Sequence, residues 1–304
     1  MDRRQKEELT RLAGQAIRFH CPMDGYTTFR VGGQAEALYE AVDLEVLKRV
    51  LAYLDKEHIP YLVVGRGSNI LVKDNGLEGL VILLGGSLAR VEEKETDDIY
   101  VLAGAGLHLV ELLSYCRSSG LGGLEFLSGI PGTVGGAVAM NAGAFGEEIA
   151  SRVKEIHVVN TRGDLIVRDR SSELEFSYRK LNMEKGNVIV RVLFRLTSEA
   201  EGTVAKRISD YLKRKKESQP LEYPSAGSVF KNPPDDYAGR LIEKAGLKGK
   251  KIGGAMISEK HGNFIVNTGG AKAKDILDLM YLAQETVKKE TGIQLEPEIR
   301  VVGK

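Results

Sequence analysis

Hydrophobic positions along this chain recur alternately with the period of a helix and with that of a strand. In residues 43–58 they follow a helical period behind Asp43, a residue type that commonly caps helix N-termini. An apolar run follows at 60–65 and is typical of a buried strand. The pattern predicts a helix that leads into a strand, and the buried face of this helix is formed by Leu47, Val50, Leu51 and Leu54.

The same patterns organise the rest of the chain. Strands are predicted at 77–85 and 98–106, and the helix predicted over 107–120 ends where Gly120 can take the C′ position. Residues 155–169, with a turn near Gly163, and 187–196 predict antiparallel strands. The polar segment 197–202 is the best domain boundary. Beyond it, the expected helices are 203–216, 238–246 and 273–290, and the expected strands are 251–258, 262–267 and 293–303.

Composition and charge exclude several classes of protein. With 304 residues, 42% of them hydrophobic and 28% charged, the chain can bury a sizeable core, and global disorder is excluded. Its 43 basic and 42 acidic residues give a net charge of +1, which provides no broad field for nucleic acid or an anionic membrane. We therefore expect small-molecule ligands without nucleic acid or membrane insertion, and an obligate protein partner is not implied.

Cysteines, histidines and the N-terminus bear on location and metal binding. Cys21 and Cys116 lie far apart without CxxC spacing, which favours a reducing compartment. The first ten residues are charged, and no stretch approaches eighteen consecutive apolar residues. We expect a cytoplasmic protein without a metal site, since the five histidines show no ligand spacing. The basic run 213–217 is expected to be a solvated helix face.

Two glycine-rich segments carry the strongest chemical signal. In "GRGSN", residues 65–69, Gly65 and Gly67 permit positive φ, so that successive amides can form an anion nest. Residues 128–146, "SGIPGTVGGAVAMNAGAFG", hold six glycines and four alanines, and Gly132 is expected at positive φ. Uncharged amides of this kind suit a pyrophosphate. Tight turns and close strand packing are the alternative reason for glycine at these positions.

Neither segment fits the Rossmann fingerprint. That fingerprint requires GxGxxG opening a helix within a βαβ unit, with an acidic residue about 20 positions later. The residues therefore favour a dinucleotide that is held by a different fold.

Eight collinear motifs resemble the UDP-N-acetylenolpyruvoylglucosamine reductase family: "TTFRVGG", "GRGSNILV", the second glycine segment, "SYR", "SAGSVFKNP", "AGRLIEKAGLKG", "KHGNFIVN" and "LEPEIR". The resemblance runs from about Tyr26 to Arg300. It implies an α+β protein with a two-lobed FAD-binding domain of the vanillyl-alcohol-oxidase (PCMH) type and a smaller α/β substrate-binding domain. The short spacing after "SYR" resembles the family form that lacks an extra substrate-capping loop. The implied boundaries are 1–197 for the first domain, with lobes of about 1–85 and 86–197, and 198–304 for the second.

The resemblance also implies an activity and cofactors. The family reduces its substrate to UDP-N-acetylmuramate with NADPH through bound FAD, a step of peptidoglycan precursor synthesis and thus of cell wall biogenesis, cell shape and cell division. We expect noncovalent FAD because neither glycine segment contains a histidine. The implied FAD contacts are Gly65, Arg66, Gly67, Ser68, Asn69, Gly129, Ile130, Pro131, Gly132, Thr133, Gly135, Gly136 and Ala137.

Three catalytic residues follow from the same resemblance. Arg179 can hold a carboxylate or enolate in bidentate fashion, and Ser228 would donate a proton. Glu296 and Glu298 lie two apart on the strand expected near 294–302, so both side chains should face the same way. The family pattern selects Glu298 as the third catalytic residue. Contacts with the UDP-sugar are expected from Tyr178, Lys231, Asn232 and Arg240.

Two other functions remain open at this point. An FAD-dependent oxidase of the same fold, acting on a small alcohol or sugar, would retain both glycine segments but has no reason to keep all three catalytic residues. A nonenzymatic nucleotide-sugar-binding protein would purify colourless.

Overall fold

The computed structural model of the protein describes residues 1–94 and 99–304, and Asp98, at the start of one expected strand, lies outside them. The chain divides into two compact units. Unit 1 comprises Met1–Phe19, Ala37–Arg66 and Glu78–Lys213, and unit 2 comprises His20–Glu36, Gly67–Leu77 and Arg214–Lys304. Each unit is therefore assembled from segments that are separated in the sequence.

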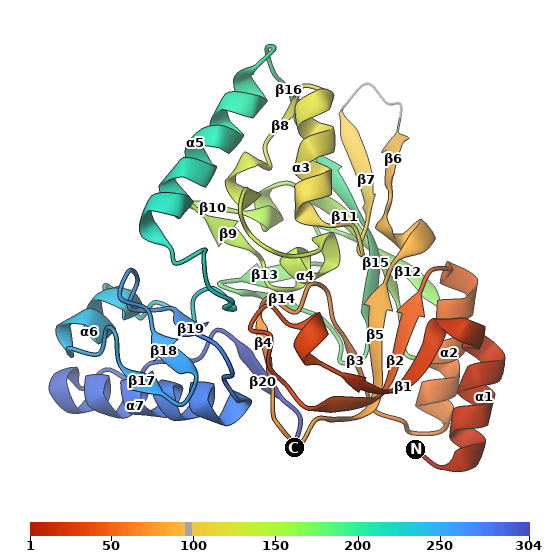
Figure 1. The fold of residues 1–304 in the computed structure, drawn as a ribbon. Helices are drawn as coiled ribbons and strands as arrows, with labels where there is room; N and C mark the ends of the chain where they lie inside the picture. The colour runs from red at the N-terminus through yellow and green to blue at the C-terminus, as the bar shows by residue number, and fades with distance from the viewer. Residues whose placement is uncertain (95–98) are drawn as a thin grey trace. The chain divides into compact units, whose positions relative to one another are not determined.

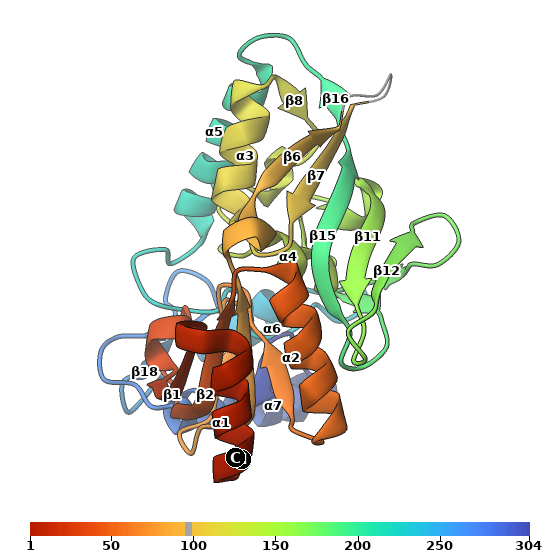
Figure 2. The ribbon, with the colours of Figure 1, turned by 90° about the vertical axis from the view of Figure 1, so that its right-hand side faces the viewer.

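The first lobe is a four-stranded sheet covered by two helices. The strands run in the order β1-β2-β5-β3, with β3 parallel to β5. The predicted first helix is confirmed as α2, because the Asp43 side chain accepts a 2.9 Å bond from the Val46 amide and the four predicted apolar residues are fully buried. Helices α1 and α2 lie side by side (Figure 2). The bounds are α1 Arg3–Ala13, β1 Ile17–Pro22, β2 Gln34–Ala41, α2 Leu44–Lys56, β3 Tyr61–Val63 and β5 Leu77–Leu84.

The second lobe of unit 1 is a five-stranded sheet in the order β12-β11-β15-β7-β6 (Figure 1). The predicted antiparallel pairing is confirmed, with β11 and β12 joined at Gly163, where φ is 85°. Helix α3 packs its buried leucines into the core of this lobe. The bounds are β6 Val91–Lys94, β7 Tyr100–Gly104, α3 Leu109–Ser118, β8 Leu121–Gly122, α4 Val134–Ala139, β9 Gly143–Ala144, β10 Glu147–Glu148, β11 Val153–Val159, β12 Leu165–Asp169, β13 Glu175–Ser177, β14 Lys180–Asn182, β15 Val188–Arg195, β16 Thr197–Ser198 and α5 Thr203–Ser218.

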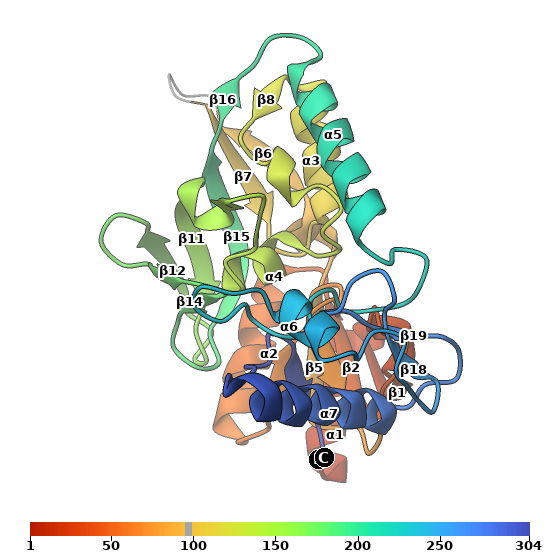
Figure 3. The same cartoon turned by 90° about the vertical axis from the view of Figure 1, so that its left-hand side faces the viewer.

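Unit 2 combines a small antiparallel sheet, β17-β18-β19, with helices α6 and α7 (Figure 3). Its core also takes Phe29, Val31 and Leu71 from the N-terminal half of the chain. Strand β4 pairs in parallel with β20, the last strand of the chain. The bounds are β4 Ile70–Val72, α6 Ala238–Lys244, β17 Lys251–Ile252, β18 Ala255–Ile257, β19 Ile265–Asn267, α7 Ala273–Thr291 and β20 Arg300–Val302.

Two features differ from the sequence-based expectation. The boundary between the two compact units in this region lies near residue 213 and not at 197/198. The reason is that Ile208 and Tyr211 of α5 pack against the core of the second lobe. The strand expected near 294–302 is wrong over 294–299, where Pro297 forms only an isolated bridge with Phe230. Proline has no amide to donate, so regular pairing begins after it.

Candidate functional site

Gly65 of the first glycine segment meets Thr133 of the second, and both residues lie in unit 1. A Cβ on Gly65 would overlap Oγ1 of Thr133 and lie 3.5 Å from its Cβ, so that the Gly65 backbone lies directly against this side chain. Thr133 is also the N-cap of α4, where its hydroxyl accepts a 3.4 Å bond from the Gly136 amide. Segments 68 residues apart, counted from Gly65 to Thr133, thus form one local surface.

Positive φ occurs at Gly67 (66°) and Gly129 (70°). The expectation of positive φ at Gly132 is wrong, and Gly65 does not adopt it either. Gly135 packs closely, since a Cβ there would lie 2.8 Å from the Ala105 Cβ and its amide donates a 2.8 Å bond to the Ala105 carbonyl. Turn geometry and close packing therefore account for different glycines of the same segments.

Much of the glycine surface is bare backbone that faces solvent. Gly65, Gly129 and Gly136 are exposed, whereas Thr133 and Ala137 are buried beneath them. A Cβ at Gly65 would collide with Thr133, so the backbone stays bare there, and its uncharged amides suit a pyrophosphate group. The residues present in unit 1 thus fit a dinucleotide. Of the remaining expected contacts, Arg66 and Pro131 are exposed, Gly67 is buried, and Ser68, Asn69, Ile130, Gly132 and Gly135 are half-buried.

Arg179 lies at the tip of the β13–β14 hairpin. Ser177 pairs with Lys180, so Tyr178 and Arg179 form the two-residue turn, and Arg179 has a φ of 58°. Such a conformation is uncommon for a residue other than glycine and is often found at functional sites. The Arg179 guanidinium lies 5.0 Å from the centre of the Tyr178 ring.

The end of the second glycine segment supports this hairpin. Nδ2 of buried Asn141 donates a 3.0 Å bond to the Ser177 carbonyl. A Cβ on Gly143 would lie 3.3 Å from Nη1 of Arg179, so a larger residue there would crowd the guanidinium. Asn141 was not predicted from the sequence, although its place beside the glycines is a usable signal.

In unit 2, backbone pairing brings the segment that carries Ser228 together with the segment that carries Glu298. The Glu298 amide donates a 2.8 Å bond to the carbonyl of Val229, the residue after Ser228. The Lys231 amide donates a 2.9 Å bond to the Glu296 carbonyl. Residues about 70 positions apart are therefore held in one local structure.

The two candidate glutamates have different environments. Glu296 and Glu298 precede β20 and do not lie on a regular strand, contrary to the expectation. Glu296 is exposed and its carboxylate lies 3.5 Å from the Lys231 ammonium. Glu298 is half-buried, and its carbonyl accepts a 3.2 Å bond from Nδ2 of Asn69. The local structure thus separates the glutamate that the family pattern selects from its neighbour.

The expected substrate-binding residues have local partners of their own. Oδ1 of Asn232 accepts a 3.1 Å bond from the Ala238 amide at the start of α6. Nε of Arg240 donates a 2.7 Å bond to Asp236, which raises the pKa of Arg240 and lowers that of Asp236. Tyr178 is 45% exposed. Lys231, Asn232 and Arg240 belong to unit 2 with Ser228 and Glu298, whereas Tyr178 belongs to unit 1 with Arg179.

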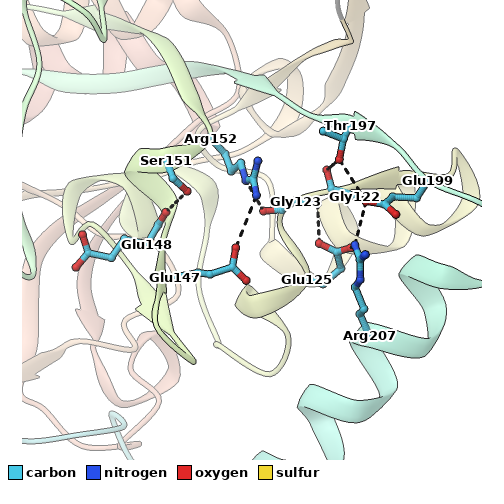
Figure 4. A network of polar contacts seen from close by, with 10 residues as sticks. All are labelled: Gly122, Gly123, Glu125, Glu147, Glu148, Ser151, Arg152, Thr197, Glu199 and Arg207. Atoms are coloured by element: carbon cyan, nitrogen blue, oxygen red, sulfur yellow. Dashed lines mark hydrogen bonds and ion pairs between the residues drawn. The ribbon is translucent and has the colours of Figure 1, made fainter.

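A polar network in unit 1 was not predicted from the sequence. Arg207 of α5 lies 3.2 Å from buried Glu125 and 3.0 Å from Glu199, while Glu125 also accepts a 2.6 Å bond from the Gly123 amide (Figure 4). These contacts fix the first half of α5 to the second lobe. Nothing in the local sequence pairs residues 82 positions apart.

The basic run 213–217 is not uniformly solvated. Lys215 is 5% exposed, and burial lowers its pKa to about 8, which corrects the expectation of a solvated face at this position. Burial also lowers the pKa of His261. Among the residues that the structure describes, no group of three His, Cys, Asp or Glu side chains could hold a metal ion. None of the described helices is long and apolar enough to cross a membrane.

Sequence comparison and structure comparison with known proteins point to the same family. Residues 35–168 match the FAD binding domain family, and residues 219–302 match the UDP-N-acetylenolpyruvoylglucosamine reductase C-terminal domain. The chain is 44% identical over 300 residues to UDP-N-acetylenolpyruvoylglucosamine reductase of Syntrophus aciditrophicus, covering 98% of this chain and 96% of that one. It is 44% identical over 293 residues to the reductase of Geobacter metallireducens, covering 96% and 95%. The crystal structure of the reductase from Thermus caldophilus superposes with a TM-score of 0.82 at 39% identity, covering 94% of this chain and all of that one.

Proposed function

We propose, from the premise that this chain belongs to the UDP-N-acetylenolpyruvoylglucosamine reductase family, that Arg179, Ser228 and Glu298 are its catalytic residues. The enzyme is an FAD-dependent oxidoreductase that reduces UDP-N-acetylenolpyruvoylglucosamine, with NADPH as hydride donor, in peptidoglycan precursor synthesis. The predicted α+β class and the FAD-binding domain are confirmed. No observation favours the oxidase or the nonenzymatic binding protein.

The proposed roles follow from the chemistry of reducing an enolpyruvyl ether. FAD, when bound by the glycine segments, would supply the hydride chemistry that links NADPH to the vinyl carbon of the substrate. Arg179 binds the carboxylate and stabilises the negative charge that develops next to it. The Ser228 hydroxyl donates a proton to the carbon that bears this carboxylate, and Glu298 assists at the same intermediate. The observation that carries this assignment is the 2.8 Å bond that joins Glu298 to the residue after Ser228.

We also propose which residues hold the cofactor and how. The two glycine segments, residues 65–69 and 129–137, would bind FAD through backbone amides. His108 lies near the second segment because it forms a backbone bridge with Thr133, but it is the N-cap residue of α3 and neither segment itself contains a histidine. We therefore propose noncovalent FAD, so that acid precipitation should release the yellow chromophore; flavin retained in the pellet would contradict this.

The finer assignments of partners and location are proposals as well. The net charge of +1 supports small molecules, without nucleic acid, as the partners. Cys21 and Cys116 are both buried and form no disulfide, which supports a reducing, cytoplasmic location. Tyr178, Lys231, Asn232 and Arg240 are proposed to contact the UDP-sugar.

Separate measurement of the two half-reactions tests the catalytic assignment. In Ser228→Ala, NADPH should still bleach the flavin at the parent rate, whereas reoxidation by the substrate should slow by about 10²- to 10⁴-fold, because only that step requires a positioned acid. Glu298→Gln should show the same asymmetry. Stopped-flow absorbance of the flavin under anaerobic conditions measures both steps.

Glu296→Gln is the matched control for the glutamate, since it makes the same change two positions away at an exposed ion pair. It should leave both steps within about threefold of the parent. A Ser228→Ala protein that reoxidised at the parent rate would remove Ser228 from the proposed role. A larger effect at Glu296 than at Glu298 would overturn the choice of glutamate.

A further inference from the structure

We propose that Asn263 is a positioning residue that holds Ser228 and Glu298 for proton delivery. This inference rests on the proposed function, because it takes Ser228 as the proton donor. Asn263 precedes β19 in unit 2 and is 3% exposed. Its side chain contacts neither catalytic residue directly and acts through the segment between them.

The Asn263 side chain forms hydrogen bonds with both the backbone amide and the backbone carbonyl of Phe230. Its Oδ1 accepts a 2.9 Å bond from the Phe230 amide, and its Nδ2 donates a 2.8 Å bond to the Phe230 carbonyl. The Asn263 carbonyl also accepts a 2.9 Å bond from the Val229 amide. Three bonds from one residue thus fix the two residues that directly follow Ser228.

Pairing on the opposite side explains why a side-chain amide is needed. Phe230 faces Pro297 across an isolated bridge, and the flanking bonds are Glu298 amide to Val229 carbonyl and Lys231 amide to Glu296 carbonyl. In this arrangement the Phe230 amide and carbonyl point away from Pro297. Phe230 is 1% exposed, so both groups must find partners inside the protein. An amide side chain supplies one acceptor and one donor, which matches this need.

Loss of the Asn263 side chain would therefore reach both catalytic segments. The Phe230 amide and carbonyl would be left buried without partners, and the segment would shift to satisfy them. Ser228 lies two residues before Phe230, and Glu298 is bonded to Val229, so the same shift would displace the hydroxyl and the glutamate together. A displacement of about 1 Å can slow a positioned step by about 10²-fold.

Asn267 provides a matched control on the same segment. It is also a buried asparagine in unit 2, and its side chain donates a 2.9 Å bond to the Phe29 carbonyl and accepts a 2.9 Å bond from the Gly269 amide. Neither of these bonds involves residues 228–231 or 296–298. Asn263→Ala and Asn267→Ala should lower the unfolding temperature to a similar degree, so stability alone does not separate them.

The experiment compares Asn263→Ala, Asn267→Ala and Ser228→Ala holoenzymes by anaerobic stopped flow. NADPH should reduce the flavin at the parent rate in all three. Reoxidation by saturating UDP-N-acetylenolpyruvoylglucosamine should slow by about 10- to 100-fold in Asn263→Ala and stay within about threefold in Asn267→Ala. The solvent deuterium isotope effect on reoxidation should rise in Asn263→Ala, because proton delivery limits the rate more strongly. In the Ser228→Ala background, Asn263→Ala should add little, since both changes affect one step.

Each other outcome has a defined meaning. If Ser228→Ala slows reoxidation but Asn263→Ala does not, or if both asparagine variants slow it equally, the positioning role is overturned and the proposed function stands. If Ser228→Ala reoxidises at the parent rate, the assignment of the proton donor fails and this inference fails with it. Should Asn263→Ala not fold, Asn263→Asp replaces it, because it keeps the acceptor for the Phe230 amide and loses the donor; parent-rate reoxidation in that variant would also overturn the role.

Discussion

Gly65 needs the absence of a side chain because its backbone lies against Thr133. A Cβ at Gly65 would overlap Oγ1 of Thr133, although Gly65 does not adopt positive φ. Gly65→Ala should therefore displace the two glycine segments relative to each other and lower the FAD content of the purified protein severalfold. The ratio of flavin to protein absorbance measures this content.

Thr133→Ala in the same chain is the informative companion. It removes the overlapping oxygen and leaves ordinary contact at 3.5 Å, so Gly65→Ala/Thr133→Ala should regain flavin relative to Gly65→Ala, despite the loss of an N-cap worth about 1 kcal/mol. Gly25→Ala, at a position with open space, should retain the parent content. No recovery in the double variant would show that the steric explanation is wrong.

Burial of Lys215 lowers its pKa, and the protein should therefore become more stable as the pH rises. Its folded pKa of about 8 lies below the value of about 10.4 in an unfolded chain. The unfolded state therefore binds more protons between these values, and the free energy of unfolding rises as pH increases from 8 towards 10.4. Relative to Lys215→Met, the parent should gain about 2–3 kcal/mol between pH 7 and pH 10.

Urea unfolding of both proteins at the two pH values measures this difference. Lys213→Met is the control, because Lys213 is an exposed member of the same basic run and should show no such pH-dependent difference. If the free energies of unfolding of the parent and Lys215→Met differed by the same amount at both pH values, the lowered pKa of Lys215 would be contradicted.

At the scale of single elements, the α5 helix depends on its contact with the second lobe. Arg207 lies 3.2 Å from Glu125, a buried carboxylate whose other bond comes from the Gly123 amide. Arg207→Met should lower the free energy of unfolding by about 1–3 kcal/mol, because it leaves Glu125 buried with fewer partners. Equilibrium urea unfolding measures the change.

An exposed ion pair provides the comparison for this prediction. Arg3 and Glu7 are 93% and 64% exposed, so Arg3→Met should change the free energy of unfolding by less than about 0.5 kcal/mol. Arg207→Met/Glu125→Gln should recover part of the loss, since the buried charge is then gone as well. Equal effects of Arg207→Met and Arg3→Met would show that burial of Glu125 does not strengthen the contact.

At the scale of the whole molecule, unit 2 is not a contiguous stretch of sequence. Phe29, Val31 and Leu71 are buried in its core, and β4 pairs with β20. A fragment of residues 198–304 lacks these three side chains, each worth about 1.5–3 kcal/mol when buried, and their sum approaches the stability of a typical domain. The isolated fragment should therefore show no near-UV circular dichroism and no cooperative thermal transition. A cooperative transition in the fragment would instead support the contiguous domain 198–304.

The sequence alone predicted those structural elements that are determined by neighbouring residues. The capped helix α2 and the antiparallel strands around Gly163 were predicted because their signals lie within a few residues of one another. The collinear motifs identified the family and its FAD-binding and C-terminal domains, since motif order is a property of sequence alone. The positions of Arg179, Ser228 and Glu298 as catalytic residues came from the same source and stay a prediction.

Only the tertiary structure determined which distant residues meet. The overlap of Gly65 with Thr133, the burial of Lys215 and the bonds from Asn263 to Phe230 join residues or environments that no local pattern connects. The separation of Glu296 from Glu298 likewise depends on pairing with Val229 and Lys231, which lie in another part of the chain. Local periodicity reports whether a position is apolar and how it repeats, whereas the partner of a buried polar group is decided by long-range packing, because it must be found wherever the folded backbone brings one.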